Sequence, residues 1–445
     1  MKKLDTGKLL SDYGNVLVLL LLCVVISVVT LEEQSPRSTA AAENLAGIIV
    51  GEAGKDANTL ILIRRGEGQQ EFANTLKNTL SKAGLNVTDT VVGTPADART
   101  ALEKQTEPLD VIATDEHMAA FCIEQLPKLA KKYPNLANTT AYQPKKHLWP
   151  NFLKKENLLN VLKQISVVAI IAIGMTMVII TAGIDLSVGS LIAFSGVITA
   201  LSIQQLSGGA DPTTGHLLLG CAAGILVCAL IGMGTGGLVT LFNIPAFIVT
   251  LGVMFIAKGL AFIFSQSAPI PIANEGFAWL GRGSDLMGLP NSVVLMLLLY
   301  GIAHVIMTHT SIGRYIYAVG GNPEAARLSG VPVKWVLVFV YTLCGLLAGL
   351  GGVMEASLHI TGDPKSGTLV ELQVIAAVVV GGTSLAGGQG KIFGTLVGAL
   401  IIGVIRNGMN LTGVEAHMQS VVYGVVILIA VMVDQLKNRG IKTTA

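Results

Sequence analysis

The chain has 445 residues, of which 51% are hydrophobic and only 13% charged, and its formal net charge is +2. Water-soluble domains carry about a quarter charged residues, so most of this chain is not built to face water. The near-neutral balance, without a basic stripe, argues against a nucleic-acid partner.

The chain begins with a short apolar segment, residues 16–30, behind a head that carries Lys2, Lys3 and Lys8. A signal peptide has a similar pattern, but the nearest small-residue stretch, 38–42, does not follow promptly. We expect residues 1–30 to form a retained transmembrane helix.

Charge is concentrated in residues 31–146, which hold 28 of the 58 charged side chains. The pattern predicts strands at 59–63, 85–92 and 109–113, and helices at 69–82, 96–105 and 116–132. Strands that alternate with helices predict a small α/β domain around a three-stranded parallel sheet.

Residues 147–445 are predicted to form a transmembrane domain, because apolar segments of nearly spanning length follow one another. These segments are 161–181, 186–203, 216–240, 246–264, 293–307, 336–354, 372–385, 392–405 and 420–433. With the first helix they make about ten. The expected fold is therefore mainly α, a polytopic transmembrane helical bundle with an inserted small α/β domain. Runs of small residues in the spans would let helices approach closely.

Lys and Arg accumulate in alternate connections, which favours cytoplasmic N- and C-termini. Arg327, Lys334 and Lys391 are then cytoplasmic, and the insert is extracytoplasmic. Lys154, Lys155 and Lys163, on the predicted outer side near the second span, run against this pattern.

Residues 181–190 place Asp185 between two apolar spans, flanked by Gly183 and Gly189. A carboxylate at membrane depth costs about 3 kcal/mol or more unless it is paired or hydrated. The glycines allow a broken helix, and Ser187 is expected to cap the next helix by accepting from its free N–H groups. The segment, with Ser190, is either a break that lines a transport path or a capped tight turn. The residues alone are compatible with both interpretations.

Residues 313–330 lie in the longest connection assigned to the cytoplasm. Pro323 suits the first turn of a helix, Asn322 its cap and Glu324 its positive N-terminal end, and Gly330 closes the element. We expect a short amphipathic surface helix, either bound by a partner protein or without one.

The glycine-rich run at 380–390 lacks the Gly-Lys-Ser/Thr ending of a phosphate-binding loop and joins two apolar segments. Since the chain has no such loop elsewhere, ATP-driven transport would require a separate ATPase. No catalytic or metal-binding constellation is apparent, so an enzyme is not expected.

Three stretches together resemble the permease family of ribose, xylose, arabinose and galactose ABC importers, and most closely its ribose members. They are 174–176 with 183–190, 313–330 and 375–388. The similarity covers 147–437 almost throughout and 1–30 loosely. It implies a subunit that translocates a ribose-like monosaccharide across the cell inner membrane and has no cofactor of its own.

The resemblance also implies partners and site residues. The partners are a cytoplasmic ABC ATPase that holds ATP and Mg, a periplasmic sugar-binding protein, a second permease copy in a homodimer, the monosaccharide and membrane lipid. The residues implied to form the coupling helix against the ATPase are Asn322, Pro323, Glu324, Ala325, Ala326, Arg327 and Leu328. The break near the sugar route is implied to contain Gly183, Asp185, Ser187, Gly189 and Ser190.

The family has only a short loop where this chain has residues 31–146. The insert instead resembles part of the second lobe of a periplasmic sugar-binding protein. The matching stretches are Arg65-Gly66-Glu67-Gly68, Pro95-Ala96-Asp97 and Asp115-Glu116-His117-Met118-Ala119. Thr114 replaces the usual asparagine and a second lobe is missing, so we expect no tight sugar binding by the insert alone.

Two other functions compete with that of an ABC permease. An ion- or proton-coupled secondary sugar transporter would work without an ATPase, and the 313–330 segment argues against it. A membrane-tethered sensor could use the insert to recognise a ligand, but the chain carries no kinase or signalling domain.

Overall fold

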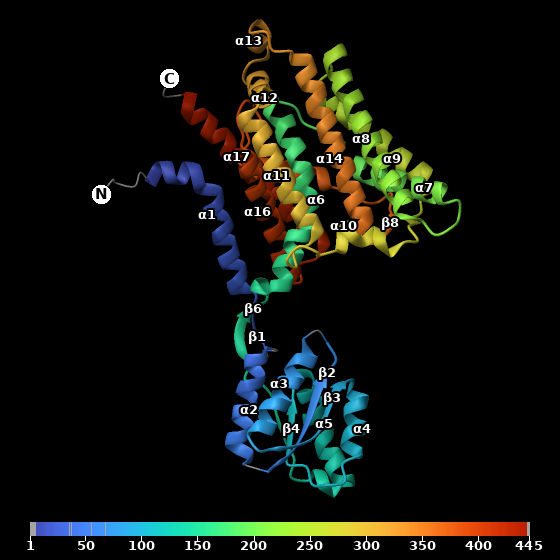
Figure 1. Ribbon diagram of the computed structural model, residues 1–445. Helices are drawn as coiled ribbons and strands as arrows, with labels where there is room; N and C mark the ends of the chain where they lie inside the picture. Colours follow the sequence, from blue (N-terminus) through green and yellow to red (C-terminus); the bar gives the residue numbers. More distant parts are fainter. Residues whose placement is uncertain (1–5, 35, 37, 55, 67, 443–445) are drawn as a thin grey trace. The chain divides into compact units, whose positions relative to one another are not determined.

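The computed structural model describes residues 6–34, 36, 38–54, 56–66 and 68–442, which Figure 1 traces in chain order. They fall into two compact units: Leu31–Pro150 is one, and the helices before and after it form the other. The residues Lys2, Lys3 and Glu67, used above, lie outside the described residues.

The unit outside Leu31–Pro150, here called the membrane unit, is almost entirely helical. Its helices are α1 (Thr6–Val29), α6 (Lys155–Ile180), α7 (Val188–Ser207), α8 (Thr214–Phe242), α9 (Ala246–Phe264), α10 (Trp279–Arg282), α11 (Asn291–His309), α12 (Ser311–Gly321), α13 (Pro323–Leu328), α14 (Val333–His359), α15 (Val370–Val380), α16 (Ile392–Leu411) and α17 (Ala416–Lys442). Two 3₁₀ turns (Asn151–Leu153 and Glu275–Ala278) and the antiparallel pair β7 (Ile270–Pro271) and β8 (Thr361–Gly362) complete it.

Seven helices in the described part of the chain are long and apolar enough to cross a membrane: α6, α7, α8, α9, α11, α14 and α16. Three shorter apolar stretches lie in Gly14–Val29, Val370–Val380 and Ala416–Ile429. Each predicted span thus overlaps a helix. The three shorter stretches are not long enough to establish that the chain crosses the membrane ten times. The 11-residue helix α15 rises only about 16 Å, against roughly 30 Å of hydrocarbon.

Small residues bring the membrane helices into backbone contact, as predicted from their frequency. A Cβ on Gly232 of α8 would collide with the Tyr341 carbonyl of α14, and one on Gly345 of α14 would collide with the Cys228 carbonyl of α8. Lipid gives helices no hydrophobic drive to associate, so such close approach supplies much of the packing energy.

The unit Leu31–Pro150, here called the insert, contains a four-stranded parallel sheet in the order β3-β2-β4-β5. Its elements are α2 (Thr39–Ala53), β2 (Asn58–Arg64), α3 (Gln69–Lys82), β3 (Asn86–Gly93), α4 (Pro95–Glu103), β4 (Val111–Thr114), α5 (Glu116–Lys132), a 3₁₀ turn (Pro134–Leu136) and β5 (Thr140–Tyr142). Alternate residues of β2 face two separate cores. Ile61 and Ile63 pack with α2 and α3, while Leu60 and Leu62 pack with α4 and α5.

The sequence predicts three strands in the parallel sheet, whereas the structure adds a fourth, β5, and a further helix, α2. The fourth strand, β5, has three residues, too few for a two-residue alternation to be recognised. Helix α2 is rich in alanine and glycine and begins at the Ser38 cap, whose side chain accepts from the Ala41 amide. In the sequence, its first residues show only the small-residue pattern of a cleavage site.

The start of α4 has reciprocal capping. Thr94 accepts from the Asp97 amide, and the Asp97 carboxylate accepts from the backbone and hydroxyl of Thr94 at 2.8 Å each. These hydrogen bonds, the backbone one first, lower the pKa of Asp97. The capping box fixes the turn that leads from β3 into the helix.

The chain leaves and re-enters the membrane unit at adjacent points. Strand β1 (Leu31–Gln34) pairs antiparallel with β6 (His147–Pro150), with Leu31 opposite Pro150. Within the membrane unit, the amide of Asn151 donates to the Thr30 carbonyl at 2.9 Å, and that of Phe152 to the Thr30 hydroxyl at 3.3 Å. The insert is therefore delimited by Leu31 and Pro150, rather than by residues 31 and 146.

Candidate functional site

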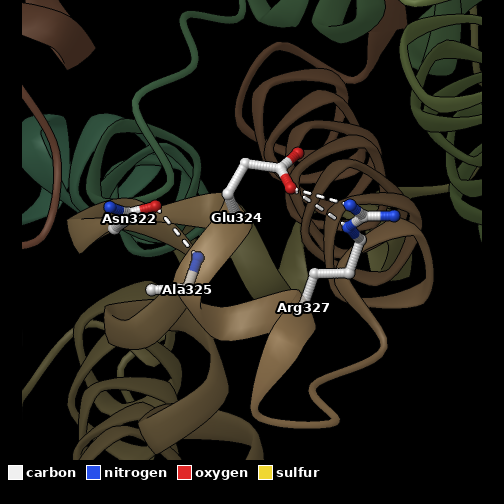
Figure 2. Close-up of polar contacts among 4 residues, drawn as sticks. All are labelled: Asn322, Glu324, Ala325 and Arg327. Atoms are coloured by element: carbon white, nitrogen blue, oxygen red, sulfur yellow. Dashed lines mark hydrogen bonds and ion pairs between the residues drawn. The ribbon is translucent and has the colours of Figure 1, made fainter.

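Helix α13 is the short surface helix expected from the sequence. Figure 2 shows the Asn322 side chain accepting from the Ala325 amide at 3.0 Å, while Pro323 occupies the first helical position. Gly330 follows with φ +84°, and its amide donates to the Arg327 carbonyl. The predicted cap, first turn and end are thus confirmed as local geometry.

The outer face of α13 is exposed and carries an ion pair. Arg327 and Glu324 approach to 2.8 Å (Figure 2), and their side chains are 68% and 74% exposed. Leu328 is 83% exposed. Ala326 is the buried residue of this helix. Exposed pairs contribute only about 0.2–1 kcal/mol to stability, so this face is not needed to hold the fold together.

Residues 181–187 interrupt the helical path between α6 and α7, as predicted. The positive φ in this break falls at Ala182 (+60°), not at a glycine. Asp185 is only 1% exposed, and the Thr250 hydroxyl of α9 donates to the neighbouring Ile184 carbonyl at 3.2 Å. The break is therefore packed inside the bundle.

The prediction that the Ser187 hydroxyl caps α7 is wrong. Its hydroxyl donates to Asp185 Oδ1 at 2.6 Å, and its amide donates to the same oxygen at 2.9 Å. Ser187 occupies the cap position but makes no side-chain bond to α7. A carboxylate accepts hydrogen bonds more strongly than a hydroxyl does, so Asp185 takes both donors.

The flanking glycines of the break leave room for other helices. A Cβ on Gly183 would collide with the Tyr341 hydroxyl, and one on Gly189 with the Glu371 carboxylate. Ser190, next along α7, is buried. The five residues implied by the resemblance are thus brought together in a tightly packed region, and their role in translocation stays a prediction.

A backbone contact joins the break to the segment that carries α13. A Cβ on Gly320, near the end of α12, would collide with the Ile180 carbonyl at the end of α6. The Gly388 amide donates to that same carbonyl at 2.8 Å, and the Tyr317 hydroxyl donates to the Gly390 carbonyl at 2.7 Å. We call Ile180, Gly320 and Gly388 the glycine junction. It connects α6, α12 and the glycine-rich run between α15 and α16.

A cavity of about 570 Å³ lies elsewhere in the membrane unit, among α6, α7, α14, α15 and α16. Its polar lining comprises Gln164, Glu355, His359, Thr361, Asp363, Lys365, Ser366, Thr368, Gln373 and Arg406. None of these residues is predicted from the sequence to belong to a site. A usable signal was present, since Gln164, Gln373 and Arg406 each interrupt an apolar helix, but nothing local shows that they converge.

A model of the permease component of branched-chain amino acid transport systems matches residues 157–431, more than half of the chain. The chain belongs to this permease family. The match begins beyond the insert, in α6, and includes the break, the glycine junction, α13 and the cavity-lining helices.

Several curated relatives of this permease are named as sugar permeases. It is 46% identical over 298 residues to the ribose import permease protein RbsC of Escherichia coli, covering 65% of this chain and 89% of that protein. It is 44% identical over 291 residues to its Bacillus subtilis namesake, with coverages of 65% and 88%. The L-arabinose ABC transporter permease protein AraH of Azospirillum brasilense is 37% identical over 289 residues, with coverages of 65% and 83%. No solved structure matches.

Family membership and the seven long apolar helices make the protein a multi-pass inner-membrane permease. It is the sugar-transporting component of an ABC importer, not an enzyme. An importer of this class works with an ATPase and a substrate-binding protein.

Proposed function

We propose that this permease forms a homodimer that carries a ribose-like monosaccharide inward, powered by a separate ATPase that holds ATP and Mg²⁺. The observation that carries the proposal is the 46% identity to a ribose import permease across 89% of that protein. No cofactor of the permease itself and no nucleic acid are involved. A secondary transporter or a sensor is not favoured, because α13 offers a surface for an ATPase.

We propose the residues from Asn322 to Leu328 as the coupling element. The cap at Asn322 and Pro323 fixes the start of α13, and its exposed charged pair and Leu328 face outward. The glycine junction supports this role, because it ties the same segment to the end of α6 by backbone contact.

The proposed orientation places both termini in the cytoplasm and the insert outside. Arg327 on α13, Lys334 at the start of α14 and Lys391 before α16 then lie on the cytoplasmic side, as positive-inside bias requires. In this orientation the insert is available to the binding protein that delivers the sugar.

Arg327→Glu is expected to leave the permease inserted but to reduce ATP-dependent ribose uptake at least about tenfold, because two like charges would replace the ion pair on the coupling surface. The measurement is ribose uptake and ATP hydrolysis in vesicles that contain the permease, its ATPase and the sugar-loaded binding protein.

Arg99→Glu is the matched control. Arg99 also forms an exposed pair within one helix, with Glu103 at 3.0 Å, but it lies in the insert, so Arg99→Glu should leave ATP hydrolysis measured without the binding protein at the parental level. The coupling role would be excluded if Arg327→Glu showed normal ribose uptake and normal stimulation of ATP hydrolysis by the sugar-loaded binding protein. Ribose uptake by the parent without any ATPase would instead support secondary transport.

We propose that the insert helps to capture the binding protein and is not the sugar receptor. Joining Thr30 to Asn151 by a short Gly-Ser linker should preserve the membrane unit, since these residues already hydrogen-bond. We expect this deletion to weaken capture of the sugar-loaded binding protein about tenfold, or about 1.4 kcal/mol. Binding to the purified permease–ATPase complex measures this.

The isolated insert, residues 31–150, should bind no ribose by calorimetry, because a single lobe cannot close around a sugar. Tight ribose binding would contradict this assignment. Unchanged capture by the deletion would remove the insert from the docking step.

A further inference from the structure

The cavity in the membrane unit is lined by three polar side chains, of which those of Gln164 and Arg406 are exposed. Gln164 comes from α6, Gln373 from α15 and Arg406 from α16. None of the three has a hydrogen bond or ion pair to any residue within the described ranges, whereas Glu355 pairs with His359 at 3.4 Å. An arginine within an apolar helix is costly unless it faces water or a partner, so its position on a cavity calls for an explanation.

The chemistry of this lining selects a neutral, polyhydroxylated ligand. Glu355 and Asp363 balance Lys365 and Arg406, so the cavity has no large net charge to attract an ion. Carboxamides offer both donors and acceptors, and a guanidinium offers a fork of donors, which together suit neighbouring hydroxyl groups. Its volume falls within the range of about 300–1,000 Å³ of small-molecule sites.

The cavity lies at the end of the bundle away from α13. Helix α14 begins five residues after α13 and runs through 27 residues, about 40 Å, to His359 in the cavity lining. In the orientation proposed above, this end faces outward, where a sugar released by the binding protein would arrive.

We propose that this cavity is the permease's own binding site for the incoming monosaccharide, held by the side chains of Gln164, Gln373 and Arg406. The inference rests on the proposed function and adds the site that accepts the sugar. Binding there must be weak enough for the sugar to leave again, as in any conduction path. The same three residues also line a smaller crevice, together with apolar residues of α6 and α16 such as Ile165 and Ile402.

The test is protection of a cysteine at the cavity rim. Thr368 lines the cavity and is exposed, so Thr368→Cys gives a thiol that a membrane-impermeant maleimide can reach. We expect D-ribose to slow its labelling in the permease–ATPase complex, with half protection at roughly 1–10 mM. Thr214→Cys, at the exposed start of α8 and outside this cavity, should label at one rate whatever the ribose concentration.

Gln373→Leu, made in the Thr368→Cys background, should raise the ribose concentration for half protection about tenfold, because one hydrogen-bonding group is lost. Leucine suits an apolar helix, so the variant should fold. The matched control is Gln205→Leu, an exposed glutamine of α7 that does not line the cavity. Its protection should equal that of the parent. Sorbitol serves as the osmotic control.

The outcomes separate this inference from the proposed function. Ribose uptake by the parent without any protection of Thr368→Cys would overturn the site and leave the function standing. Equal protection in the Gln373→Leu and Gln205→Leu variants would overturn the assignment of the contacts. No ATP-dependent ribose uptake by the parent would overturn the proposed function itself.

Discussion

Gly320→Ala is expected to abolish most ATP-dependent uptake, whereas Gly321→Ala should leave it near the parental level. A methyl group on Gly320 has no space, because it would collide with the Ile180 carbonyl and approach the Gly388 amide. Overpacking at a close contact typically costs about 1–3 kcal/mol, and here the obstacle is backbone that cannot rotate away. The glycine junction would open, and movement of α13 would no longer reach the end of α6.

Gly321 is an unusually close control for this experiment. It is the next residue of α12, and a Cβ added there meets nothing within 4 Å. Both substitutions add one methyl group to the last turn of α12, so the difference between them reports the contact at the junction. Uptake and ATP hydrolysis in vesicles should be compared after normalising to inserted permease. Parental uptake by Gly320→Ala would mean that the junction is not needed for transport.

Asp185→Ala is expected to lose uptake by a larger factor than it loses expression. The carboxylate accepts from both the amide and the hydroxyl of Ser187, and all these groups are buried. Removing it would leave two buried donors without a partner, at a cost of about 1–3 kcal/mol each. The turn between α6 and α7 would then lose its fixed geometry next to the glycine junction.

Asp185→Asn is the informative companion, because it keeps an acceptor oxygen in nearly the same place. We expect it to retain most uptake if the side chain acts by holding Ser187. Equal losses in both variants would instead require the charge of the carboxylate. Parental uptake by Asp185→Ala would reduce the residue to a dispensable turn residue.

Local features of this protein were predictable from the sequence because few residues determine them. The cap of α13 depends on Asn322, Pro323 and their immediate neighbours, and it was placed correctly. The apolar spans follow from composition over about 20 residues. The predicted cap at Ser187 is wrong because the Asp185 carboxylate, two residues away, accepts from the Ser187 hydroxyl.

Features that join distant parts of the chain could not be predicted in the same way. The glycine junction brings together residues 180, 320 and 388, and no periodicity links them. The cavity likewise gathers Gln164, Gln373 and Arg406 from three helices. In each case the residue type was visible in the sequence, but its neighbours were set by helix packing.

The pairing of β1 with β6 also bears on how this permease could have acquired its insert. The Asn151 amide donates to the Thr30 carbonyl, and β1 pairs with β6. The two ends of the insert are therefore adjacent, and for the membrane unit the whole insert is a loop whose ends are already closed. The entropy of closing a loop grows only with the logarithm of its length, and a folded domain with adjacent ends adds little to it. The first connection of the permease is thus a site that tolerates domain insertion. One folded domain could replace another there without any change in the packing of the surrounding helices.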